Sequence, residues 1–193
     1  MCFRNTLLAT LAFAGVSFGA QATTYNLSGS LGASPTFSIT SGGNTATFTS
    51  PSGNGFAVQD TTGLLSFSTA LLDSNFFGGD ALTITFATPV TNEILIPFAI
   101  LNSYSTTDSL QITTGAGTVR TFAASPDTLA LGEPEGLIAF VPTNPLTTLT
   151  LVSVNTSNAF AIGNITVPEP MSLSLLGMGL AGMAALRRNK RTV

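Results

Sequence analysis

Residues 81–101 read ALTITFATPVTNEILIPFAIL, and this stretch decides the fold class of the chain. Apolar side chains occupy every second position in both of its halves: Leu82, Ile84 and Phe86, then Ile94, Ile96, Phe98 and Ile100. Successive side chains of a β-strand point to opposite faces of its sheet, so the pattern predicts two neighbouring strands separated by the turn-forming Thr88-Pro89. Pro97 cannot donate a ladder hydrogen bond, and we therefore expect the second strand to lie at a sheet edge or to carry a bulge.

The same short alternation recurs from residue 24 to residue 166, in runs bounded by Gly, Pro, Asn and Asp. Further strands are predicted over residues 24–31, 36–40, 46–49, 55–59, 64–68, 110–113, 118–123, 137–141, 148–154 and 159–166. Many short strands without a soluble helix predict an all-β fold, a two-sheet antiparallel sandwich of the jelly-roll type, with a closed barrel as the alternative. Gly163 and Asn164 interrupt the last run and predict a bulge or a bend.

Phenylalanine is the main aromatic residue, and most copies fall on the apolar sides of these runs. We expect them to form the core: Phe37, Phe48, Phe56, Phe67, Phe86, Phe98, Phe122, Phe140 and Phe160.

The composition of residues 23–167 excludes several classes of function. This stretch contains no His, Cys, Trp or Lys, and Arg120 is its only cation against eight carboxylates, which gives a net charge of −7. Nucleic acid is excluded as a partner because phosphate neutralisation requires clustered Lys or Arg. Catalysis by Ser/His/Asp or Cys/His groups and zinc chemistry lack their residues. A carboxylate pair could hydrolyse a glycosidic bond, but no spacing singles one out, so we expect no enzyme.

The N-terminal residues 1–22 have the organisation of a signal peptide. Arg4 supplies a positive charge, residues 6–20 form an apolar stretch, and Ala20-Gln21-Ala22 fits an A-x-A cleavage site. The mature protein is then expected to begin at Thr23. Because the only cysteine, Cys2, lies in this leader, the mature protein would contain no disulfide.

The C-terminal residues 168–193 combine three features in order. Pro168-Glu169-Pro170 precedes an apolar segment at 171–186, and a basic tail at 187–193 begins with Arg187 and Arg188. Cations beside an apolar span favour its cytoplasmic side, so the residues before the span would face outward. As a helix, the segment would extend about 24 Å, less than the roughly 30 Å hydrocarbon core of a bilayer.

These residues resemble the PEP-CTERM sorting signal of Gram-negative bacteria. The resemblance implies processing near the motif by an exosortase, after transient anchoring in the inner membrane, and a link to exopolysaccharide production. Residues 158–167 are also similar to the last strand of many members' sandwich domains, where an acidic residue stands in place of Gly163. That departure removes a carboxylate and argues against an inherited calcium site at this position.

Two candidate binding sites remain inside the body. Asp73, Asn75 and Asp80 fall in a glycine-bearing stretch between apolar runs, and oxygen ligands of this kind suit calcium. The spacing matches no known calcium loop, and such residues often cap turns instead. Tyr104, between Ser103 and Ser105, is the aromatic candidate for stacking a sugar ring. Glu133-Pro134-Glu135 is interpreted as a solvated loop rather than a ligand pair.

The sequence therefore predicts an exported, non-catalytic cell-surface or extracellular-matrix protein associated with exopolysaccharide or biofilm. Its expected partners are the export machinery, an exosortase, the membrane before processing, and exopolysaccharide. No cofactor is required, with calcium as the one candidate. A lectin-like carbohydrate-binding module, with or without calcium, is the first alternative. A carboxylate-based glycan-active enzyme is the second.

Overall fold

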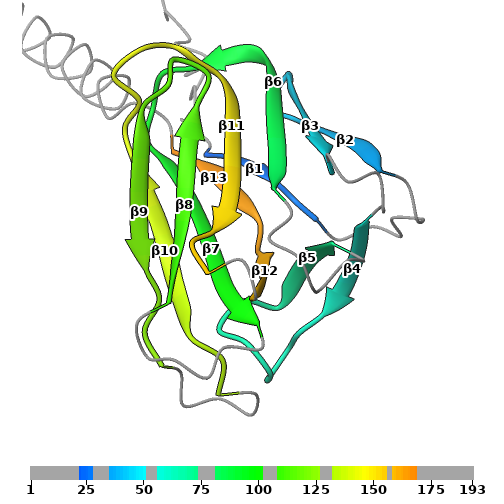
Figure 1. Cartoon of the computed structure of the whole chain (residues 1–193). Helices are drawn as coiled ribbons and strands as arrows, with labels where there is room; N and C mark the ends of the chain where they lie inside the picture. The colour runs from blue at the N-terminus through cyan, green and yellow to red at the C-terminus, as the bar shows by residue number, and fades with distance from the viewer. Residues whose placement is uncertain are drawn as a thin grey trace, which may run out of the picture. The chain divides into compact units, whose positions relative to one another are not determined.

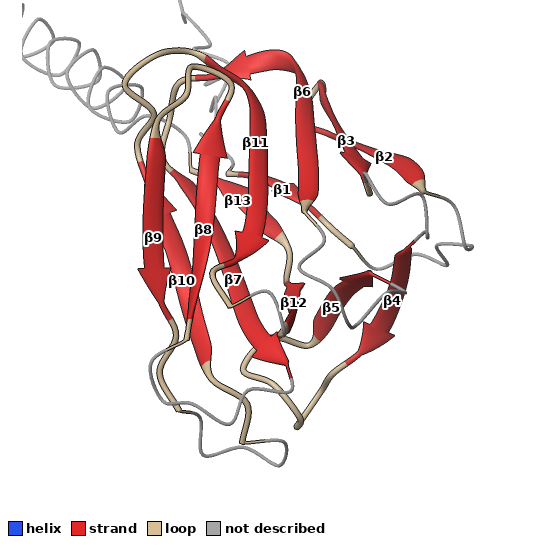
Figure 2. Cartoon of the chain, in the orientation of Figure 1, coloured by secondary structure: helices blue, strands red, loops and turns tan. Residues whose placement is uncertain are grey.

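The computed structural model describes residues 22–27, 35–50, 56–73, 81–101, 108–126, 132–155 and 158–168, with Phe56, Leu72 and Asp73 described by their backbone alone. Residues 21–170 form one compact unit. The described part contains thirteen strands and no helix (Figures 1 and 2). The strands are β1 (Thr23–Tyr25), β2 (Thr36–Ser41), β3 (Asn44–Thr49), β4 (Phe56–Asp60), β5 (Thr69–Asp73), β6 (Leu82–Val90), β7 (Ile94–Leu101), β8 (Ser109–Thr114), β9 (Val119–Ala123), β10 (Glu135–Phe140), β11 (Leu146–Ser153), β12 (Ala159–Ile162) and β13 (Ile165–Val167).

The strands form two sheets in which every ladder is antiparallel. Sheet A has seven strands, in the order β1-β13-β7-β12-β5-β4, with β10 on the other side of β7. Sheet B has six strands in the order β2-β3-β6-β11-β8-β9. The sheets stack face to face (Figure 1), which confirms the predicted two-sheet antiparallel sandwich.

One continuous hydrophobic core fills the space between the sheets. It takes the alternating side chains of both inner faces, including Ile84 of β6, Ile96 of β7 and Leu149 of β11, all with no exposed surface. Most of the predicted core phenylalanines are confirmed. Phe48, Phe86, Phe98 and Phe140 are buried, Phe37, Phe122 and Phe160 pack against this core, and Phe67 packs in a second cluster. Burial of this kind is the main favourable contribution to folding.

The prediction that residues 82–86 and 94–100 form neighbouring strands is wrong. β6 belongs to sheet B and β7 to sheet A, so the short connection between them crosses from one sheet to the other. The chain changes sheet again between β7 and β8, β9 and β10, β10 and β11, and β11 and β12. Alternating apolar residues show that a strand has one buried face. They do not show whether the next strand lies beside it in the sheet or opposite it across the core.

Pro97 does not place its strand at an edge, because β7 pairs with β10 on one side and with β12 and β13 on the other. The irregularity lies in the partner instead. Ile162 pairs with Phe98, and Thr166 pairs with Leu95. Between these two pairs, the chain advances four residues from β12 to β13 but only three residues along β7. This extra residue is a β-bulge, which confirms the bulge predicted at Gly163 and Asn164. A side chain at residue 163 would come within 2.7 Å of Pro97 Cγ.

The predicted strand at 64–68 is wrong, and the strand β5 at 69–73 was not predicted. Residues 61–68 form a loop that covers part of the outer face of sheet A. Leu65 and Phe67 pack there in a second, smaller cluster with Ala70, Ala99 and Ala161. The apolar residues of this segment do alternate, but they belong to a loop packed on the outside of the sandwich and not to a hydrogen-bonded strand.

Candidate functional site

The outward face of sheet B carries hydroxyl side chains in register across neighbouring strands. One row follows the pairs Thr36–Thr49, Thr49–Thr83, Thr83–Thr150 and Thr150–Thr113, from β2 to β8. A second row follows Ser38–Thr47, Thr47–Thr85 and Thr85–Thr148. Neighbouring strands lie about 4.8 Å apart, so each row is a regular line of hydroxyl groups. The two rows together are called the hydroxyl face.

The hydroxyl face arises from the strand period. Thr and Ser alternate with buried apolar residues, as in Thr83-Ile84-Thr85 and Thr148-Leu149-Thr150, so one side of each strand enters the core and the other remains at the surface. Neighbouring hydroxyls interact: Ser38 Oγ lies 2.8 Å from Thr47 Oγ1. Threonine is also the polar residue best suited to a pleated sheet.

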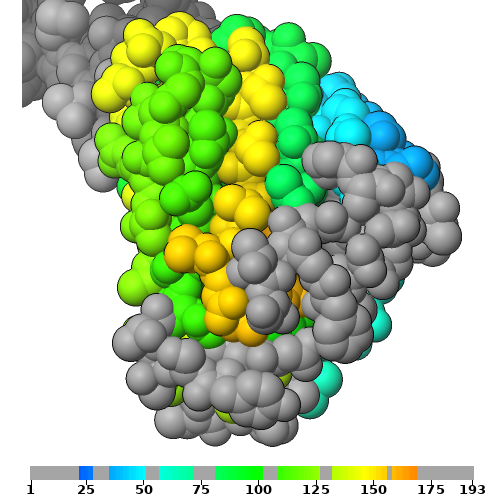
Figure 3. Space-filling model, viewed as in Figure 1, coloured from blue at the N-terminus to red at the C-terminus, as the bar shows by residue number. Residues whose placement is uncertain are grey.

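Charge is missing from this face. Among the residues of the six strands of sheet B, Arg120 is the only charged one. It pairs with the buried Ile112, and directly opposed side chains share a face, so Arg120 belongs to the core side of the sheet. In Figure 3, β9, β8, β11 and β6 form a continuous surface toward the viewer. Each hydroxyl there can donate and accept a hydrogen bond.

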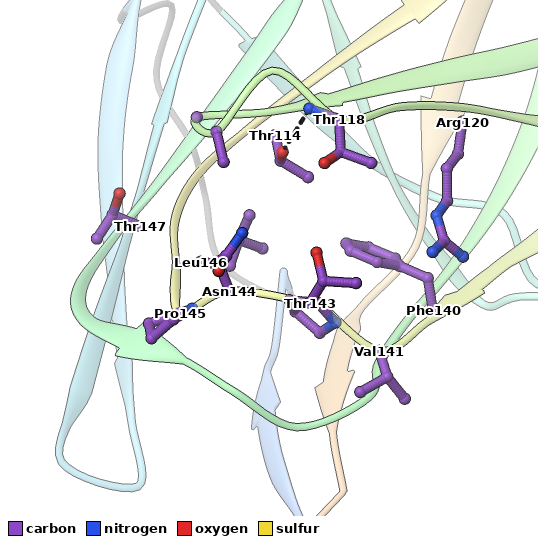
Figure 4. A pocket seen from close by; sticks show the side chains of 13 residues that line it. Thr114, Thr118, Arg120, Phe140, Val141, Thr143, Asn144, Pro145, Leu146 and Thr147 are labelled. Carbon is purple, nitrogen blue, oxygen red and sulfur yellow. Dashed lines mark hydrogen bonds between the residues drawn. The ribbon is translucent and has the colours of Figure 1, made fainter.

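Arg120 lines a hollow at one end of the sandwich (Figure 4). The turn between β8 and β9 and the connection between β10 and β11 form its walls, which include Thr118, Thr143 and Asn144. The turn is well held, because Thr114 N donates to Thr118 O at 2.9 Å and Thr118 N donates to Thr114 Oγ1 at 3.1 Å. Sequence reasoning singled out Arg120 as the sole cation but not as part of a hollow.

The candidate sites predicted from the sequence are only partly within the described residues. Asp73 is the last residue of β5, where its backbone pairs with Phe56, so it belongs to a strand and not to the loop in which it was predicted. Asn75, Asp80 and Tyr104 lie outside the described residues. In the described ranges, no three His, Cys, Asp or Glu residues lie close enough to hold a metal ion.

The sorting and cleavage residues also lie mostly outside the description. Pro168 directly follows β13 and Ala22 directly precedes β1, whereas Ala20, Glu169, Pro170, Arg187 and Arg188 are not described. β1 pairs with β13 so that Thr23 lies opposite Val167. A membrane-spanning helix is not found among the described residues, and the predicted span at 171–186 is outside them.

Several described carboxylates have structural partners. Glu135 begins β10 and accepts hydrogen bonds from the backbone N–H of Ser66, at 2.9 and 3.0 Å, and from its hydroxyl. It thereby ties the 61–68 loop to the sheet, so the interpretation of Glu133-Pro134-Glu135 as a solvated loop is wrong for Glu135. The loop contact joins residues distant in sequence, so no local pattern signals it.

Asp108 and Asp60 illustrate two further structural roles. Asn158 Nδ2 donates to Asp108 Oδ2 at 2.7 Å, and both residues are buried. At the end of β4, hydrogen bonds from the Thr62 side chain and backbone hold the pKa of Asp60 below its usual value. These contacts fix local structure and do not bring two carboxylates together for acid–base chemistry.

Comparison with known proteins identifies the C-terminal region. Residues 166–190 match the PEP-CTERM protein-sorting motif, so the resemblance drawn from the sequence is confirmed for this region. A comparison with curated protein sequences finds no match.

The solved structures similar to this chain include carbohydrate-binding modules. The module CsCBM6-3 from Clostridium stercorarium, in complex with cellobiose, has 11% identity and a TM-score of 0.39 over 75% of this chain and 100% of its own. A family 35 module from Cellvibrio japonicus has 13% identity and a TM-score of 0.35 over 77% and 88%. A family GH115 4-O-methyl-α-glucuronidase has 14% identity and a TM-score of 0.37 over 60% of this chain and 16% of the enzyme. Similarities this low assign neither a ligand nor an activity to this chain.

Proposed function

We propose that this chain is an exported, exosortase-processed protein whose body acts without catalysis at the cell surface or in the extracellular matrix, in association with exopolysaccharide. The observation that carries the proposal is the PEP-CTERM sorting motif at residues 166–190. Such a motif implies handling by an exosortase at the membrane before the body reaches the outside. The signal peptide at 1–22, the body at 23–167 and the sorting signal at 168–193 are the corresponding parts.

The ends of the sandwich support these boundaries. β1 begins at Thr23, the first residue after the proposed signal cleavage site, and β13 ends at Val167, directly before the proline that opens the motif. Because Thr23 pairs with Val167, removal of both terminal segments would leave every described strand in place. Residues 21–170 also form a compact unit with their own core. We therefore expect the processed body to fold by itself.

The hydroxyl face supports association with polysaccharide. A sugar polymer presents closely spaced hydroxyl groups, and Thr and Ser side chains can both donate to and accept from them. A face without charge requires no ion to be desolvated when a polymer covers it, and burying an unpaired charge is costly. A matrix component that contacts a hydrated polymer over a wide area would use many individually weak contacts of this kind.

Export and processing are tested in the source organism with a tagged full-length chain. We expect mass spectrometry of the mature protein to find an N-terminus at Thr23 and a C-terminus near residues 168–170. Replacement of Glu169 by Ala should leave the precursor in the membrane fraction. If the mature protein retained the basic tail and the Glu169→Ala variant reached the surface equally well, exosortase processing would be refuted.

Polysaccharide association is tested by co-sedimentation of residues 23–168 with exopolysaccharide from the same organism, in calcium and again in chelator. Saturable binding in both conditions is expected for the hydroxyl face. Binding that disappears in chelator would favour the calcium-dependent lectin-like alternative and the stretch from Asp73 to Asp80. Hydrolysis of the polysaccharide during the incubation would favour the glycan-active enzyme instead.

A further inference from the structure

Arg120, which lines the hollow described above, is the only cation in residues 23–167, and the same residues carry eight carboxylates. A lone guanidinium in such a domain would be expected to pair with one of these acids. None of the described residues forms an ion pair or hydrogen bond with it, and its side chain is exposed. Its positive charge is therefore available to a ligand.

Arg120 lies on an edge strand of sheet B, on the side of the sheet that faces the core. β9 is an edge strand of sheet B, and Arg120 lies on the same side of the sheet as Ile112, facing sheet A. Figure 4 shows Arg120, Phe140, Thr118 and Thr143 among the side chains that line this hollow. Phe140 is almost fully buried and gives this side of the hollow a fixed apolar wall.

We propose that this hollow binds the carboxylate of an acidic sugar residue, a uronic acid, within the polysaccharide. A guanidinium presents two parallel N–H groups that match the two oxygens of a carboxylate. The hydroxyls of Thr118 and Thr143 and the amide of Asn144 line the same hollow and can bond the hydroxyls of the same sugar. The ligand class rests on the polysaccharide association proposed above, whereas the site itself can be tested with a single sugar.

Charge favours a carboxylate over a phosphate. A phosphate monoester carries about −1.5 to −2 charges at neutral pH and is commonly bound by clusters of arginine. Here one guanidinium stands in a body of net charge −7, which repels a multiply charged ligand more strongly than a singly charged one.

The test is a titration of residues 23–168 with galacturonate, followed by NMR. Galactose tests the requirement for the carboxylate, and inorganic phosphate tests selectivity among anions. We expect galacturonate to shift the Arg120 Nε–H signal and the backbone amides of residues 115–118, Thr143 and Asn144. Arg120→Gln should weaken binding by on the order of 10- to 100-fold, because hydrogen bonds to charged groups are strong. Arg120→Lys should recover only part of the affinity.

Thr121→Val is the matched control, since Thr121 follows Arg120 in β9 but points to the opposite face of the sheet. It should bind galacturonate as the wild type does, and circular dichroism should show that all variants are folded. The proposal is overturned if galacturonate does not bind, if galactose binds equally well, or if Arg120→Gln changes nothing. Phosphate binding as tight as galacturonate binding, with the same dependence on Arg120, would overturn the assignment to an acidic sugar.

Failure of this titration and failure of the proposed function are distinguishable. Exopolysaccharide that co-sediments with the body while galacturonate leaves the Arg120 signals unchanged would remove the uronate site alone. Galacturonate binding without any co-sedimentation would retain the site and refute association with the polymer.

Discussion

Gly136 is the position at which the fit between the two sheets can be tested most sharply. It lies in β10, and a Cβ added there would come within 2.5 Å of Phe98 Cζ and 2.8 Å of the Ala123 carbonyl oxygen. Carbon atoms normally meet at about 3.5 to 4.0 Å, so Gly136→Ala must displace its surroundings. Phe98 has no exposed surface and the oxygen belongs to the backbone, so neither can move freely.

Overpacking of this kind costs about 1 to 3 kcal/mol. For a body of this length, each kcal/mol lowers the melting temperature by roughly 4 °C, so we expect a decrease of about 4 to 12 °C. The assay is thermal and urea unfolding of residues 23–168, followed by circular dichroism. Phe98→Leu in the Gly136→Ala background should cost less than in the wild type, because the shorter side chain relieves part of the clash.

Gly115→Ala is the matched control for this prediction. A Cβ at residue 115 would meet its nearest neighbour, Thr148 Cβ, at an ordinary contact distance of 3.5 Å. Loss of a glycine also reduces the freedom of the unfolded chain, so stability should stay unchanged or rise by up to about 1 kcal/mol. Equal melting temperatures for Gly136→Ala and Gly115→Ala would refute the packing described between β10, β7 and β9.

Two further predictions concern β1 and β13. A chain ending at Asn164 lacks the buried residues Ile165 and Val167. We expect its free energy of unfolding to be about 3 to 6 kcal/mol lower than that of a chain ending at residue 168. Equal urea midpoints for the two chains would contradict the role of β13 in the core. Burial raises the pKa of Tyr25, so its contribution to stability is present below the usual tyrosine pKa of 10.0 and is lost as the pH rises through the folded-state value. The body has no Lys or Cys, and Tyr104 is its only other tyrosine, so Tyr25→Phe should reduce the alkaline loss of stability in urea titrations at pH 9 to 12. A profile unchanged from the wild type would argue against this cause.

The strand pattern was predictable because one face of most strands is buried. Alternation around Ile84 and Ile96 identified β6 and β7 and the apolar face of each. It could not identify their partners, because pairing and sheet membership depend on contacts between distant residues. β6 and β7 lie in different sheets, and the alternation could not reveal this.

The errors at residues 64–68 and at Pro97 have related causes. Leu65 and Phe67 alternate as in a strand, yet they pack on the outer face of sheet A, a surface that no local pattern reveals. Pro97 lacks a donor, but its carbonyl accepts a hydrogen bond from Gly163 N at 2.8 Å, and the bulge in the partner absorbs the irregularity. A missing donor therefore did not require an edge.

Among the candidate sites, only the one formed by contiguous residues could be predicted from the sequence. The sorting motif could be recognised because it is a contiguous order of residue types at 168–193, independent of folding. The hydroxyl face was visible only as a polar alternation, since its rows depend on the register of five strands. The Arg120 hollow depends on two connections that meet in space, at 115–118 and 141–145, and composition alone could indicate only that its cation is unusual.

Paired Thr→Val variants test whether the body associates with exopolysaccharide through the hydroxyl face. Thr85 of β6 and Thr148 of β11 are cross-strand partners in the second row of that face, whereas Thr24 and Thr166 are cross-strand partners on the outer side of sheet A. Each double variant removes two hydroxyls and keeps the side-chain shape. In co-sedimentation with native exopolysaccharide, we predict that the Thr85→Val/Thr148→Val variant binds on the order of tenfold more weakly than the wild type, and that the Thr24→Val/Thr166→Val variant is unchanged. Equal binding by both variants and the wild type would refute association through the hydroxyl face.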